Sequence, residues 1–186
     1  TKKVKPANQP LYVESTTVEG KKVYTYRLRY QTEKGTNADQ LVFYDVLDNG
    51  TTAKPSAWKG TLQSIDISAI EGKQSAGKDG GTLSPVIYYA TTIPTQEQFD
   101  VDNGSIWSTT KPQDMNQVKA IAIDCRKVIK GTTDTNFVLE KGASLSVFVH
   151  LVAPTDPAFN EKTAVNACTI KTRTFSGTEA TASDIV

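Results

Sequence analysis

The sequence predicts an all-β fold, an antiparallel β-sandwich of about nine strands with little or no helix. Bulky residues alternate with polar ones from Tyr24 to Tyr30, and the same period recurs from Leu145 to Leu151. A period of two places alternate side chains on a buried and a solvated face of a sheet. No stretch of the chain has a comparably clear helical period, so sheets should dominate.

Turn signals separate the predicted elements. Residues 1–10 contain two prolines and predict an extended lead-in, and residues 11–18 predict an edge strand. Further strands are expected at 23–32, 40–47, 58–67, 84–92, 117–128, 136–142, 143–154 and 163–175. A single domain should therefore span residues 11–175, with residues 176–186 forming a last strand or a linker to a following module.

Residues 93–116 have no clear period. A loop of this length in a compact domain is either functional, for example a ligand-binding loop, or a sign that an element has been missed. Residues 110–117 have a composition that allows one helical turn.

Composition excludes several classes of function. The chain of 186 residues carries 21 Lys and Arg against 20 Asp and Glu, a net charge of +1. This balance gives no electrostatic reason to expect nucleic acid or an anionic membrane as partner, and no apolar run is long enough to insert into a bilayer. The chain begins without Met or an apolar segment, so we expect a processed or excised fragment.

Catalytic and cofactor signatures are missing from the sequence. Its one His, His150, has no Cys or carboxylate at metal-ligand spacing. We find no phosphate-binding loop and no nucleophile beside a base. We therefore expect a protein that is not an enzyme and that holds no metal and no cofactor.

The two cysteines are expected to face the interior. Cys125 shares strand parity with Ile121 and Ile123, and Cys168 shares it with Ile170. Two interpretations follow: a disulfide between Cys125 and Cys168, which would constrain the unfolded chain, or two buried thiols that act as small apolar residues.

Three polar residues share the same inward parity: Lys22, Asp45 and Asn166. A buried amine, a carboxamide and a carboxylic acid have the groups needed to form an amide with loss of ammonia. Burial favours the neutral forms of an amine and an acid, as that reaction requires. The alternative is that Lys22 is solvated at a strand end, Asp45 caps a turn region and Asn166 bonds backbone.

Much of the chain resembles a known kind of module. The similarity covers residues 12–172 and lies in the YTYRLRY strand, the Asp45-x-Leu47 element, the PVIYY and VKAIAID strands and the late Ala164-x-Asn166. These motifs resemble the Ig-like, isopeptide-forming fimbrial modules, and the tandem domains with a YTYTLTY…DTLP pattern, of large wall-anchored surface proteins of Gram-positive bacteria.

The resemblance implies an Ig-like sandwich in an extracellular, cell-wall-anchored adhesin, acting as a rigid stalk or spacer. Its partners would be neighbouring modules of the same polypeptide and a host protein or glycan. In cross-linked members an early Lys is bonded to the late Asn, with the Asp as catalyst, and Asp45 and Asn166 match those positions. The resemblance places the Lys well before the Tyr-rich strand, where this chain has Tyr12, Val13 and Glu14.

A second function is compatible with the composition. The two tryptophans, Trp58 and Trp107, together with exposed Tyr could form a platform on which sugar rings stack. The chain would then be a carbohydrate-binding module. A change of Trp fluorescence on sugar addition separates this hypothesis from the stalk, and Trp58 could instead belong to the core.

Overall fold

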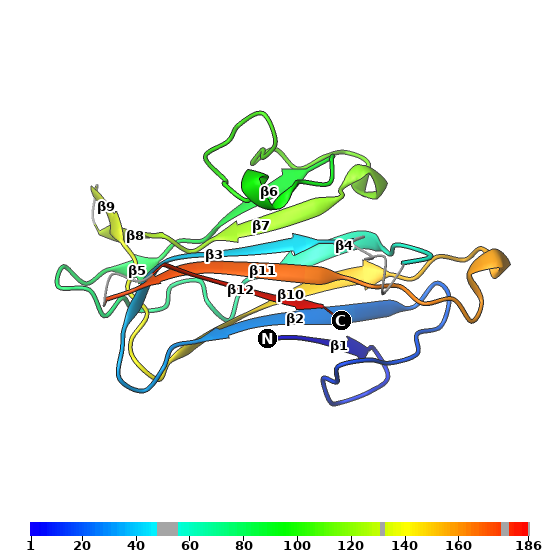
Figure 1. The fold of residues 1–186 in the computed structure, drawn as a ribbon, viewed down its shortest axis with the longest axis horizontal. Coiled ribbons are helices and arrows are strands. Elements are labelled where there is room, and N and C mark those ends of the chain that lie inside the picture. The colour runs from blue at the N-terminus through cyan, green and yellow to red at the C-terminus, as the bar shows by residue number, and fades with distance from the viewer. Residues whose placement is uncertain (48–55, 131–132, 176–178, 186) are drawn as a thin grey trace.

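The computed structural model describes residues 1–47, 56–130, 133–175 and 179–185, which form antiparallel sheets without an α-helix (Figure 1). The all-β sandwich is confirmed. The first sheet has the order β1 (Lys2–Pro6), β2 (Val23–Gln31), β10 (Ser144–Val152), β4 (Thr61–Asp66). The second has the order β12 (Glu179–Ile185), β11 (Ala167–Thr174), β3 (Ala38–Val46), β7 (Ala120–Asp124), β6 (Val86–Ala90). A small third sheet joins β5 (Thr82–Leu83), β8 (Lys127–Lys130) and β9 (Thr133–Asn136).

The main core lies between the first two sheets, and strand alternation builds it. In β10 every second residue is buried, as the period of two predicts. These inward residues meet the inward faces of β3 and β7, including Phe43, Ile121 and Ile123, which have no exposed surface. Apolar area removed from water on both inner faces is what holds the two sheets together.

The second sheet is covered on its outer face as well. In β3 and β7 nearly all residues are buried, on both faces. The connection between β6 and β7, residues 91–119, folds over this face and adds Phe99, Val101 and Trp107 to a second apolar cluster with Val42 and Tyr44. The segment without period is thus a packed cover that contains the short 3₁₀-helices η1 (Gln96–Gln98) and η2 (Met115–Gln117).

The N-terminal region differs from the sequence prediction. Residues 2–6 form β1, a strand of the first sheet, where an extended lead-in was expected. Residues 11–18 are not a strand; only Val13 pairs there, in an isolated bridge to Val4. At the other end β12 pairs with β11, so the described part of the tail is a last strand.

Within the described residues there is no helix long and apolar enough to cross a membrane. The remaining helical element is the 3₁₀-helix η3 (Pro157–Phe159), in the connection that leads from β10 to β11.

Candidate functional site

Lys2 is the most unusual residue of the interior. It lies on β1 opposite Leu28, and its side chain has no exposed surface. The parity of β1 explains this position, because Lys2 shares the inward face with Val4 and Pro6, while Lys3 and Lys5 lie on the other face. Sequence reasoning missed it, since three lysines in the first five residues look like a solvated segment. The alternation of Lys2 with Val4 was the signal available.

Asp45 and Asn166 meet Lys2 from the second sheet. Asp45 lies on β3 opposite Cys168 of β11, and Asn166 directly precedes β11. Both are fully buried or nearly so, with 0% and 1% exposure. The Lys2 Nζ donates short hydrogen bonds to Asp45 Oδ1 and to Asn166 Oδ1. An amine, a carboxyl and a carboxamide are therefore in mutual contact between the sheets.

The electrostatics of this site are set by burial. Removal from water raises the pKa of the Asp45 carboxyl, and the charge and hydrogen bond of Lys2 only partly oppose this rise. The surroundings are aromatic, since the Lys2 Nζ lies 4.3 Å from the ring centroid of Tyr26. Such a site favours the protonated, uncharged form of the Asp45 carboxyl over its carboxylate.

Lys22, the lysine proposed from parity, lies elsewhere. It precedes β2, is exposed, and takes part through its backbone in hydrogen bonds with Glu19 and Ala153. The parity with Tyr24 holds only as far as the strand does, and Lys22 lies beyond its first residue. The inward positions predicted for Asp45 and Asn166 agree with the structure; the amine that reaches them is that of Lys2.

The cysteines face the core as their parity predicts, but the disulfide is wrong. Cys125 and Cys168 are both buried and not bonded to each other. The backbone N–H of Cys125 donates to the carbonyl of Leu41 on β3, whereas Cys168 lies opposite Asp45, further along the same strand. Four residues along β3 separate these levels by about 13 Å, which exceeds the Cα separation of about 7 Å that a disulfide can span. Parity gives the face of a sheet and not the level along it.

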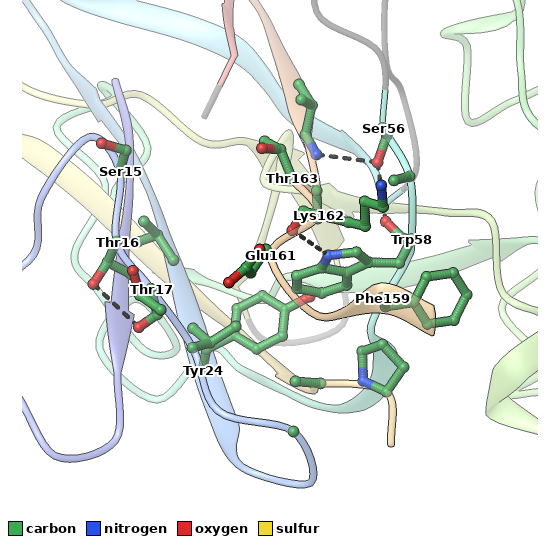
Figure 2. Close-up of a pocket in the computed structure, with 18 of the residues that line it drawn as sticks. Ser15, Thr16, Thr17, Tyr24, Ser56, Trp58, Phe159, Glu161, Lys162 and Thr163 are labelled. Carbon is green, nitrogen blue, oxygen red and sulfur yellow. Dashed lines mark hydrogen bonds between the residues drawn. The ribbon is translucent and has the colours of Figure 1, made fainter. Parts of the chain in front are cut away.

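The two tryptophans do not form one platform. Trp107 is 2% exposed, and the centroid of its ring lies 5.5 Å from that of Tyr44 in the second cluster. Its indole N–H donates to the Gln98 carbonyl at 2.8 Å. It is a core residue of the cover. Trp58 is only partly buried and lines a hollow at another place, between residues 14–18 and the connection that contains η3 (Figure 2).

A row of aromatic rings connects the two regions. Tyr26, beneath Lys2, contacts Tyr24 edge-to-face at 5.5 Å, and Tyr24 contacts Trp58 edge-to-face at 6.0 Å. These geometries are the favourable ones for aromatic pairs. The buried polar site and the hollow therefore share one rigid wall.

No metal centre is formed by the part of the chain that the structure describes, since no group of three or more His, Cys, Asp or Glu is placed to hold an ion. No family of known proteins matches this chain, and no curated protein does.

Proposed function

We propose that this chain is a structural module of a bacterial surface protein, a rigid spacer braced by an amide bond between Lys2 Nζ and Asn166 Cγ. The observation that carries the proposal is the burial of Lys2 in contact with both Asp45 and Asn166. A buried Lys–Asp pair is a weak source of stability, because desolvation offsets its attraction. A covalent product gives the same three residues a structural purpose.

The reaction needs no cofactor. The neutral Lys2 amine attacks Asn166 Cγ, and protonated Asp45 donates to Asn166 Oδ1, where negative charge develops. A new C–N bond forms, the Cγ–Nδ2 bond breaks, and ammonia leaves with the proton that Asp45 relays from Nζ. Fixed contact between the groups supplies the effective concentration that an uncatalysed amide exchange lacks. The raised pKa of Asp45 favours the protonated form that this step requires.

The position of the bond fits a mechanical role. Lys2 belongs to β1 of the first sheet, while Asn166 leads into β11 of the second. The two residues are 164 positions apart. An amide between them would join the sheets and enclose most of the chain, so that a spacer under tension would hold its core intact.

Intact-protein mass spectrometry tests the cross-link. The wild-type mass should be lower than the sequence mass by one ammonia. Asp45→Ala and Lys2→Ala should each have the full mass calculated from their own sequence. Lys22→Ala is the matched control and should keep the reduced mass, because that side chain is exposed. A folded wild-type protein at full sequence mass refutes the cross-link.

A further inference from the structure

A second feature of the molecule is the hollow beside Trp58, which the cross-link does not use. Its volume is about 1100 Å³, and it lies between two walls. One wall is the segment 14–18 that follows β1, and the other is the connection 156–165 that precedes β11. Figure 2 shows Ser15, Thr16 and Thr17 on one side of this space, Trp58 on the other, and Glu161 between them.

The floor of the hollow is held rigid. The Trp58 indole N–H donates to the Lys162 carbonyl at 2.9 Å, which fixes the ring. Tyr24 supports it edge-to-face, with an interplanar angle of 87°. Tyr24 is itself confined at Gly60, where a Cβ would lie 2.2 Å from the Tyr24 hydroxyl oxygen. A fixed, partly exposed aromatic ring offers apolar contact area to a ligand with little loss of side-chain entropy.

The walls supply hydroxyl groups. Ser15, Thr16 and Thr17 stand on one side and Thr163 on the other. The single bond within the first group, from the Thr16 hydroxyl to the Thr17 carbonyl, is long at 3.5 Å. Hydroxyls donate and accept, so they suit a ligand that does both.

The charges around the hollow are mainly negative. Its lining includes the carboxylates of Glu14, Asp156 and Glu161 and one cation, Lys162. In Figure 2 the Glu161 carboxylate points into the space between the walls. Glu161 has a φ of 60°, a left-handed conformation that non-glycine residues rarely adopt. These charges disfavour an anionic ligand and leave acceptors for hydroxyl donors.

We infer that the hollow binds a neutral saccharide. The apolar face of a sugar ring would lie on Trp58, and its hydroxyls would bond the Thr and Ser hydroxyls and the Glu161 carboxylate. A fixed aromatic floor beneath walls rich in hydroxyl and carboxylate groups suits a ligand that has both an apolar face and many hydroxyls. The inference does not rest on the cross-link, because none of its contacts involves Lys2, Asp45 or Asn166.

The test uses the intrinsic fluorescence of Trp58. The chain has two tryptophans, and Trp107→Phe leaves Trp58 as the sole reporter. Lactose, cellotriose, maltotriose and chitotriose are the neutral probes, sialyllactose is the anionic probe, and an oligolysine peptide is the cationic one. We expect a saturable change with at least one neutral probe, and calorimetry on the unmodified protein should give the same affinity.

Two variants locate the site. Trp58→Ala should weaken binding by about tenfold or more, since it removes the stacking surface, and Glu161→Gln should weaken it less. The inference is overturned if no neutral probe binds, if binding survives Trp58→Ala, or if only sialyllactose or oligolysine binds. Intact mass, measured on the same samples, reports the cross-link separately, so failure of one proposal is distinguishable from failure of the other.

Discussion

A lysine with no exposed surface is the residue that most constrains this molecule. Moving an ammonium ion into an apolar interior costs several kcal/mol, and a carboxylate partner repays this only in part. Lys2 nevertheless contacts Asp45 and Asn166 with its terminal nitrogen. The attraction of the ion pair alone does not account for the burial of Lys2, and the proposed amide bond would account for it.

The pH dependence of stability should report the Asp45 environment. Because its pKa is raised in the fold, the folded state binds that proton more strongly than the unfolded state does. Its contribution to stability is therefore largest below the ordinary carboxyl pKa and falls as pH rises from about 4 toward the folded value. In Asn166→Ala, which cannot cross-link, we expect the free energy of unfolding to fall over this pH range.

Urea titrations at several pH values measure this effect, and the double variant Asp45→Asn, Asn166→Ala is its control. The difference in unfolding free energy between the single and the double variant should decrease as pH rises. A difference that increases with pH would mean that the fold stabilises the Asp45 carboxylate, and a protonated Asp45 in the folded state would then be rejected.

The cysteines yield a separate prediction. Burial raises the pKa of the Cys125 thiol, and both cysteines are buried and unbridged. We expect an aromatic disulfide reagent to react with neither thiol in the folded protein, since both are inaccessible and burial also disfavours the reactive thiolate of Cys125.

Two thiols should then titrate at once in denaturant, without any reductant. Fast reaction of the native protein, or no reaction of the denatured unreduced protein, would contradict this expectation. The second result would mean that a disulfide forms although Cys125 and Cys168 lie at different levels along β3.

Strand parity indicated which face of a sheet a side chain lies on, but not its level along the strand. It correctly indicates that Asp45, Asn166, Cys125 and Cys168 face inward. It cannot give the level at which residues of different strands meet, because register depends on turns and on the partner strand. Parity also failed at one strand end: Lys22 and Asn166 each directly precede a strand, but Lys22 is exposed and Asn166 is buried.

At the scale of elements, the cover formed by residues 91–119 is the least expected feature. It has little regular structure, but Trp107 and Phe99 pack against Tyr44 on the outer face of β3. The Arg126 guanidinium also holds the cover in place, because it donates hydrogen bonds to both carboxylate oxygens of Asp102. Because a cover of this kind has no period, hydrophobic periodicity cannot find it.

Removal of the central ring should loosen this cover. Trp107→Ala would leave a cavity against Tyr44, and we expect a loss of about 3 to 5 kcal/mol in the free energy of unfolding. Amide hydrogen exchange should accelerate mainly in residues 91–119, while β2 and β10 stay protected.

Trp58→Ala is the matched control, since it also removes a Trp, but from a partly exposed position. Trp58→Ala should lower the free energy of unfolding clearly less than Trp107→Ala does. Equal losses for the two variants would mean that Trp107 is not the anchor of the cover.

The burial of both faces of β3 also depends on this cover. Residues 41–47 are apolar on both faces except at Asp45, so the sequence shows a nearly continuous hydrophobic stretch. The outer face of β3 is buried by residues 91–119, a segment far along the chain. The strand could be predicted locally, whereas its second layer could not.

On the scale of the whole molecule, the contact between Lys2 and Asn166 connects the first strand with the last pair of strands. β1 and β2 are antiparallel, and Lys2 lies opposite Leu28 while Pro6 lies opposite Tyr24. The last strand ends with Ile185 opposite Ala167, next to Asn166. A bond from Lys2 to Asn166 would therefore run from the first strand almost directly to the last pair, and the force between the termini would bypass the residues between them.

Pulling a single molecule by its two ends tests this path. In the cross-linked protein only the segment after Asn166 can be drawn out. In Asp45→Ala the chain between Lys2 and Asn166, which are 164 positions apart, should also unravel, adding about 550 Å of contour length. The closed loop should in addition raise the free energy of unfolding by about 5 kcal/mol in the chain-entropy estimate. Samples at known intact mass are the control, so that each trace is assigned to a linked or an unlinked molecule. Equal extensions for the wild-type protein and Asp45→Ala, both folded, would show that the tension runs through the core and that no covalent brace shields it.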